Sequence, residues 1–365
     1  MEKRPERLSS QVGFDRANGI LGWRRYGFVA SGHWYTLGNV KVSCNNSKSE
    51  EMKSIKTDES LLIRNATSNK SKYDEDNENN SKEITENTTV INDTKIGYSI
   101  YGNGLNKMLF ICGGVGCYKK DYPLSLQKSF NPSNYTIVCI DPPGYGTSRP
   151  PDRKQEVNRC MKDASFCIKL MQYLKMIPFT VLGWSEGSRT AIHVADQGRF
   201  GSLIKSVILL SAASRIDYRG VQVFKGMRNT EQWLSHTMDS YLEFYSKEFV
   251  SKQWADLCDI FEEVYNLLGG RFPCDYVLAN IKIPVLILNG GMDRFCADPN
   301  YFKSVLNNCK IESHLLGGHD FYMKYPRWFS ERLEEFLKEN KIFLLSANAD
   351  GNTAINNNND KRGEA

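Results

Sequence analysis

The chain has 365 residues, enough for one large domain or two small ones with a sizeable buried core. Its formal net charge of +5 is modest and spread along the chain, so composition does not predict a nucleic-acid partner. We expect no membrane partner either, because no apolar run is long enough to span a bilayer and no secretory signal is evident. The ten cysteines form no Cys-x-x-Cys pair, which favours reduced, buried thiols in an intracellular compartment.

Residues 1–83 are expected to be a low-complexity, largely disordered extension. Asn, Ser, Lys, Glu and Asp dominate residues 46–83, and such a composition cannot bury enough apolar surface to fold. Residues 1–45 carry scattered arginines, so an organelle-targeting segment is an alternative there, although Glu2, Glu6 and Asp15 count against it. A polar tail over residues 343–365 is also expected to be disordered.

Between residues 84 and 342, short apolar segments alternate with helical patterns. The expected strands are 94–101, 107–112, 135–140, 179–184, 204–210, 285–288 and 311–316. The expected helices are 159–174, 188–197 and 321–341. Buried apolar strands that alternate with helices predict a mostly parallel central sheet with helices on both faces.

The segment from about 213 to 280 interrupts this alternation. It is rich in aromatic residues at helical spacing, including Trp233, Tyr241 and Trp254. We interpret it as a helical cap inserted over the carboxyl ends of the strands, where ligand crevices of such sheets lie.

A Gly-x-Ser-x-Gly motif at Gly183, Ser185 and Gly187 follows one expected strand and opens a helix. That context is typical of the nucleophile elbow of an α/β-hydrolase, in which small residues flank a serine on a sharp turn. The elbow would hold the Ser185 hydroxyl above the sheet, beside the N-terminus of the next helix. Ser185 is therefore the candidate nucleophile.

A serine nucleophile needs a base, and in this fold the acid and then the histidine follow the serine in the chain. The sequence has five histidines. His319 follows Gly317-Gly318 in the loop between the last expected strand and the last helix, at the carboxyl edge of the sheet. We therefore predict His319 as the general base.

The acid that orients the base is expected just after the strand at 285–288. Asp293 lies there. Asp298 is an alternative, although its place before Pro299 is more typical of a helix cap. Asp320 is a third candidate for the acid, but it adjoins the base in the chain, and neighbouring side chains rarely face each other. Asp217 is a fourth candidate, and it would place the acid after an earlier strand of the sheet.

Two backbone amides are needed to bind the oxyanion. One candidate is the amide of Glu186, directly after the nucleophile. The second is the amide of Gly114, in the glycine-rich loop 112–116 that follows an expected strand. This chemistry requires no metal and no cofactor.

Longer motifs are similar to one known group. The block Asp141 to Arg153 (Asp-Pro-Pro-Gly-Tyr-Gly-Thr-Ser-Arg-Pro-Pro-Asp-Arg), the elbow, and the helix 328–337 resemble the valacyclovir hydrolase family of α/β-hydrolases over roughly residues 85–340. The resemblance implies a serine, aspartate and histidine triad that acts on α-amino acid esters. It also implies a mitochondrial location, and it assigns recognition of the substrate's α-ammonium group to Glu186.

The sequence departs from that family at three positions. Glu186 replaces an aspartate, Ser188 replaces a second glycine, and Ala297 stands where a proline is usual. Glu186 has a second interpretation, because an acidic residue in a first helical turn is favourable to the helix dipole by roughly 0.3–1 kcal/mol.

We therefore predict a monomeric serine hydrolase that cleaves a small-molecule carboxylic ester, with α-amino acid esters as the substrates that the resemblance favours. Glu186 is the candidate substrate-binding residue. A general esterase or thioesterase is one alternative, and a binding protein without turnover is another, because the fold alone does not determine the activity.

Overall fold

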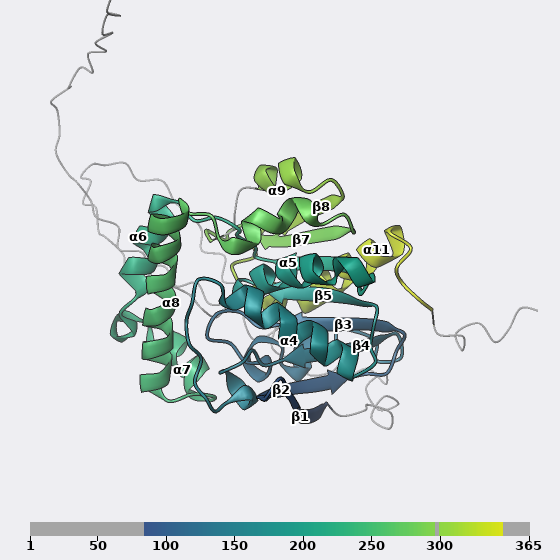
Figure 1. The fold of residues 1–365 in the computed structure, drawn as a ribbon, viewed down its shortest axis with the longest axis horizontal. Coiled ribbons are helices and arrows are strands. Elements are labelled where there is room, and N and C mark those ends of the chain that lie inside the picture. The colour runs from purple at the N-terminus through teal and green to yellow at the C-terminus, as the bar shows by residue number, and fades with distance from the viewer. Residues whose placement is uncertain (1–83, 296–298, 346–365) are drawn as a thin grey trace, which may run out of the picture.

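The computed structural model describes residues 84–295 and 299–345, built around an eight-stranded sheet (Figure 1). The strands are β1 (Thr85–Ile91), β2 (Thr94–Tyr101), β3 (Asn106–Ile111), β4 (Tyr135–Ile140), β5 (Phe179–Trp184), β6 (Ile204–Leu210), β7 (Val285–Gly290) and β8 (Cys309–His314). Their order in the sheet is β1-β2-β4-β3-β5-β6-β7-β8. Pairing is parallel from β4 to β8, whereas β2 runs antiparallel to both β1 and β4. The predicted mostly parallel sheet is confirmed.

Helices cover both faces of this sheet. One face carries α4 (Arg159–Tyr173), α5 (Glu186–Gly198) and α9 (Pro299–Val305), and the other carries α2 (Tyr118–Asp121), α3 (Leu124–Gln127), α10 (Phe321–Lys324) and α11 (Pro326–Glu339). Short 3₁₀ turns lie at η1 (Gly146–Ser148) and η2 (Arg199–Gly201). Buried side chains of alternate strand residues form a separate hydrophobic cluster on each face, as a doubly covered sheet requires.

The segment between β6 and β7 contains only helical elements. They are α6 (Tyr218–Met227), η3 (Thr230–Gln232), α7 (Ser235–Leu242), α8 (Lys247–Leu268) and η4 (Pro273–Asn280). The helices α6, α7 and α8 stand together beyond one end of the sheet (Figure 1). This is the predicted cap, and the residues of its expected aromatic stripe are buried against one another and against the core.

Three of the differences from the sequence-based expectation have a clear local cause. The edge strand β1 is too polar to show a buried pattern, and it forms because the Asn92-Asp93 turn, with positive φ at both residues, pairs it with β2. Strand β8 ends at His314, so Leu315 and Leu316 lie exposed beyond it. The expected closing helix is divided at Pro326, which begins α11.

The polar tail is attached to the sheet at its beginning. The side-chain amide of Asn106 donates to the Leu344 carbonyl at 2.9 Å, and Leu344 donates its own amide to the Asn106 side chain at 2.8 Å. Packing therefore continues past Ile342. The predictions for residues 1–83 and 346–365 lie outside the described residues. In the described part, no helix combines the length and apolar character that crossing a bilayer would need.

Candidate active site

Ser185 lies in the sharp turn between β5 and α5. Its backbone has φ 54° and ψ −113°. This conformation is unfavourable for a residue with a side chain, and it persists because the surrounding structure holds it in place. The flanking glycines are needed because a Cβ on Gly183 would lie 2.0 Å from the Gly187 carbonyl oxygen, and one on Gly187 would lie 2.2 Å from the Ile111 carbonyl oxygen. The turn thus places the Ser185 side chain at the N-terminus of α5, at the carboxyl end of the central strand.

The serine at position 188 fits this turn without crowding it. Ser188 is buried, and its hydroxyl donates to the Ser185 carbonyl at 2.6 Å. Its backbone amide donates to the same carbonyl at 3.1 Å. The extra polar group therefore has a partner within the elbow, and it ties the first turn of α5 to the residue that carries the candidate nucleophile.

The structure brings Ser185, His319 and Asp293 into one hydrogen-bonded series. His319 lies in the loop after β8, and its Nε2 is 3.0 Å from the Ser185 Oγ. Its Nδ1 is 2.8 Å from the Asp293 Oδ2. Asp293 follows β7, and its side chain is fully buried. Its second oxygen accepts the Phe295 amide at 2.8 Å, so both carboxylate oxygens have a hydrogen-bond partner.

Two opposing effects act on the imidazole of His319. Burial lowers its pKa, because it penalises the charged form, and the Asp293 carboxylate raises it by charge and by hydrogen bonding. The charge of Asp320 also raises it, and these raising effects together outweigh burial, so the pKa of His319 lies above its ordinary value. Such a histidine is a stronger base, and its cation is stabilised once it has taken a proton.

Two residues that the sequence reasoning missed hold the loop of His319. The indole N–H of Trp184 and the hydroxyl of Ser211 both donate to the His319 carbonyl at 2.8 Å. Trp184 ends β5 and Ser211 follows β6, so two neighbouring strands anchor the loop at their carboxyl ends. A tryptophan directly before the nucleophile was visible in the sequence, but its partner is 135 positions away.

The alternative acids occupy other places. Asp217 is the N-cap of α6 and accepts the Gly220 amide at 2.7 Å. Asp320 begins α10. Asp298 and the departure at Ala297 lie outside the described residues. Of the predicted acids that the structure describes, Asp293 is the one in contact with His319 Nδ1.

The glycine-rich loop after β3 lies against the elbow. The Gly113 amide donates to the Asp121 carboxylate at 2.9 Å and is therefore already used. A Cβ on Gly114 would lie 3.2 Å from Cγ of Glu186 and 2.7 Å from a methyl carbon of Leu257 of the cap, so a larger residue here would displace the Leu257 side chain. The Glu186 amide begins α5 and has no helical carbonyl one turn earlier to bond. The two candidate oxyanion donors are thus close neighbours.

The carboxylate of Glu186 does not face open solvent. It forms ion pairs with Arg159, the first residue of α4, and with Arg189, one turn further along α5. All three side chains are buried. The Cys160 thiol contacts the same carboxylate at 3.8 Å. The residue that the resemblance assigns to ammonium recognition thus already carries two guanidinium partners.

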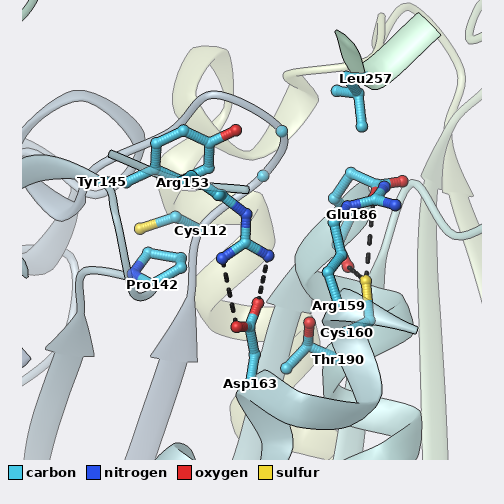
Figure 2. Close-up of a pocket in the computed structure, with 12 residues that line it drawn as sticks. Cys112, Pro142, Tyr145, Arg153, Arg159, Cys160, Asp163, Glu186, Thr190 and Leu257 are labelled. Atoms are coloured by element: carbon cyan, nitrogen blue, oxygen red, sulfur yellow. Dashed lines mark hydrogen bonds and ion pairs between the residues drawn. The ribbon is translucent and has the colours of Figure 1, made fainter. Parts of the chain in front are cut away.

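A pocket lies beside Glu186, between the ends of α4, α5 and the glycine-rich loop (Figure 2). Its lining includes Gly114, Glu186 and Leu257, together with Arg153, Arg159 and Asp163. Figure 2 shows Arg153 and Asp163 facing each other with both guanidinium nitrogens directed at the carboxylate. Among residues 84–295 and 299–345, no cluster of three or more His, Cys, Asp or Glu side chains is arranged to hold a metal ion.

Comparison with known proteins identifies the same fold. The family described as the alpha/beta hydrolase fold matches residues 106–241. The chain is 27% identical to Serine hydrolase BPHL of Mus musculus and 26% identical to Serine hydrolase BPHL of Homo sapiens, each over 259 residues that cover 70% of this chain and 87% of the relative.

Solved structures share the fold at lower identity. A bacterial membrane phospholipase A superposes with a TM-score of 0.57 at 19% identity, over 71% of this chain and 87% of the other. The serine hydrolase CarC of carbazole degradation superposes with a TM-score of 0.55 at 18% identity, over 70% of this chain and 100% of the other. The chain therefore has the alpha/beta hydrolase fold and is similar to the serine hydrolase BPHL.

Proposed function

We propose that the chain is a serine hydrolase that cleaves small carboxylic esters through an acyl-enzyme on Ser185. The observation that carries this proposal is the series Ser185 Oγ, His319 and Asp293, joined at 3.0 and 2.8 Å. His319 takes the proton of the Ser185 hydroxyl as the oxygen attacks the ester carbonyl, and it returns the proton to the departing alcohol. A water molecule that gives a proton to His319 then attacks the acyl carbonyl. The acid is released, and the proton returns from His319 to the Ser185 oxygen.

In this proposal the surroundings stabilise each charge that develops. Asp293 keeps the His319 proton on Nδ1 and stabilises the imidazolium. The amides of Gly114 and Glu186 bind the oxyanion, and the N-terminal end of α5 adds a favourable dipole. Because all these groups belong to the protein, the reaction that we propose uses no metal and no cofactor.

The preference for α-amino acid esters remains a prediction that rests on Glu186. A free carboxylate beside the nucleophile would attract a substrate ammonium group, as the family resemblance implies. In this structure Arg159 and Arg189 already neutralise that carboxylate, so an ammonium group would have to displace a guanidinium. This pairing favours the general carboxylic esterase, and it is equally consistent with thioesters, which need the same triad.

The test combines labelling with a matched pair of esters. A fluorophosphonate probe should label Ser185 in the folded wild-type protein, and it should not label Ser185→Ala. Hydrolysis of the p-nitrophenyl esters of valine and of N-acetylvaline is then compared for wild type and Glu186→Gln. Cleavage of both esters by the wild type supports the general esterase, whereas a strong preference for the free amine that Glu186→Gln abolishes would show amino-ester specificity.

If Ser185 in the folded protein is not labelled and neither ester is cleaved, the proposal is wrong. The chain would then have the fold without catalytic activity, and a non-catalytic binding protein would be the hypothesis to test next. The compartment and the oligomeric state remain predictions from the sequence.

A further inference from the structure

The pocket beside Glu186 has an excess of positive charge. Three arginines, Arg153, Arg159 and Arg189, lie in or directly behind its wall and are opposed by two carboxylates, Asp163 and Glu186. Their side chains are nearly all buried, with exposed fractions between 5% and 10%. In the described part of the chain, the salt bridges give these arginines no third carboxylate.

The two carboxylates are shared unequally. Asp163 binds Arg153 alone, through both of its oxygens. Glu186 uses one oxygen for Arg159 and the other for Arg189, so two guanidinium groups divide a single carboxylate. Arg189 is held from its other side as well, because its Nε donates to the Ala213 carbonyl at 2.8 Å and its guanidinium lies 3.5 Å from the centre of the Phe272 ring. Arg159 donates from one terminal nitrogen to the Glu156 carbonyl at 3.1 Å. It lines the pocket beside Gly114 and Glu186, whereas Arg189 lines only a second, smaller pocket that Arg159 also borders.

A buried cation without a full counter-charge is costly, and binding an anion from solution removes that cost. The planar guanidinium group is also well suited to a carboxylate, which it binds through two parallel hydrogen bonds. We propose that the ester substrate carries a second, anionic group a few bonds from the scissile carbonyl, and that Arg159 binds it while Arg189 keeps Glu186 in place.

This inference rests on the proposed function, since it places the anion beside the Ser185 elbow. The same pocket is lined by Gly114 and Glu186, the two residues whose amides are proposed to bind the oxyanion. The substrate class is therefore the half-ester of a short dicarboxylic acid, or an ester of similar charge and length. An α-ammonium group would be repelled by the net positive charge of this pocket, and it would have to compete with Arg159 and Arg189 for the Glu186 carboxylate.

Three methyl esters of matched length test the sign of the charge. Monomethyl glutarate, methyl pentanoate and methyl 4-aminobutanoate present an anionic, a neutral and a cationic end at a similar distance from the ester. For the wild-type protein we expect kcat/KM for the anionic ester to exceed that for the neutral ester by about ten-fold or more, because charge-assisted hydrogen bonds of this kind are worth about 1.5–3 kcal/mol. The cationic ester should be the slowest.

Variants then identify the arginine. Arg159→Met should bring the ratio of the anionic to the neutral ester close to one, and Arg159→Lys should restore part of it. Arg199→Met is the matched control, because Arg199 is the C-cap of the helix that Glu186 begins and its salt bridge is to Asp196, one turn earlier in that helix. Glu186→Gln should increase the ratio, since it frees both guanidinium groups. If Arg159→Met does not fold, the wild-type series and Glu186→Gln still decide the question.

The outcomes separate the two proposals. Labelled Ser185 with equal or faster cleavage of the neutral or the cationic ester would overturn the anionic substrate while leaving the serine hydrolase intact. If no ester is cleaved, the change in Tm caused by monomethyl glutarate decides the inference. A rise in Tm that Arg159→Met loses and Arg199→Met keeps supports it, and no rise overturns it.

Discussion

The indole N–H of Trp184 donates to the backbone carbonyl of His319 at 2.8 Å, so the residue before the candidate nucleophile holds the loop of the candidate base. The Trp184 ring also lies 5.4 Å from the imidazole, centre to centre. Ser211 donates to the same carbonyl from the neighbouring strand end. The position of His319 relative to Ser185 is therefore set by the backbone of its loop as well as by Asp293.

Loss of these two donors should reduce turnover more than substrate binding. Ser211→Ala removes one hydrogen bond to the His319 carbonyl, and Trp184→Phe removes the other along with part of the ring. We expect each to lower kcat roughly ten-fold with little change in KM, because small misplacements of catalytic groups have effects of this size or larger. Trp233→Phe, in the cap, serves as the control. Equal kcat values in Ser211→Ala, Trp184→Phe and wild type would contradict the positioning role.

Asp293→Asn should nearly abolish activity. The amide cannot hold the imidazole in the required tautomer or stabilise its cation, and we expect kcat to fall about 10³–10⁴-fold. His319 must be neutral to act as a base, so the rate falls as pH drops through its pKa. Without the Asp293 charge, burial outweighs the smaller opposing effect of the Asp320 charge and lowers the pKa of His319. The acid limb of any residual pH–rate profile should therefore move to lower pH.

Asp320→Asn is the control for that experiment. Asp320 adjoins His319 and its charge also raises the pKa of that histidine, although burial and Asp293 act more strongly. We expect a small acid-limb shift and almost unchanged kcat. If Asp320→Asn were the more damaging variant, the assignment of Asp293 as the acid would be wrong.

Asp121 should prove important for the proposed oxyanion loop. Its fully buried carboxylate accepts the Gly113 amide at 2.9 Å and pairs with Lys120 at 2.6 Å. Asp121→Asn leaves the largely buried Lys120 cation without its partner, which should cost about 3 kcal/mol of unfolding free energy. The double variant Asp121→Asn with Lys120→Met should regain stability but keep a reduced kcat. Full recovery of kcat in the double variant would show that the pair acts on stability alone.

His193 should make the fold sensitive to acid. It lies buried in α5, and burial lowers its pKa to about 4. A histidine whose pKa is lower in the folded than in the unfolded state contributes stability above its unfolded pKa, near 6.5, and this contribution is lost as pH falls toward 4. The loss approaches about 3 kcal/mol. The unfolding free energy, measured with denaturant between pH 7 and pH 4, should depend less on pH in His193→Leu than in wild type. An equal pH dependence in both proteins would show that His193 is not the cause of the acid sensitivity.

The alternation of buried strands with helices was readable in the sequence because the strands that are covered on both faces are mostly apolar, as in 135–140 and 179–184. The edge strand β1 was missed because its residues are mostly polar, and only the Asn92-Asp93 turn signals it. The end of β8 was misplaced by two residues, since Leu315 and Leu316 look like strand residues although the pairing with β7 stops at His314.

By itself the sequence determined the fold class and the candidate nucleophile, because a Gly-x-Ser-x-Gly motif between strand and helix is a local pattern with a local steric reason. It also limited the base and the acid to a few residues by chain order. Only the tertiary structure placed His319 between Ser185 and Asp293, and only it paired Glu186 with Arg159 and Arg189. Such contacts depend on how α4 packs against α5 and on how loops converge at one edge of the sheet, and neither is encoded in the spacing of neighbouring residues.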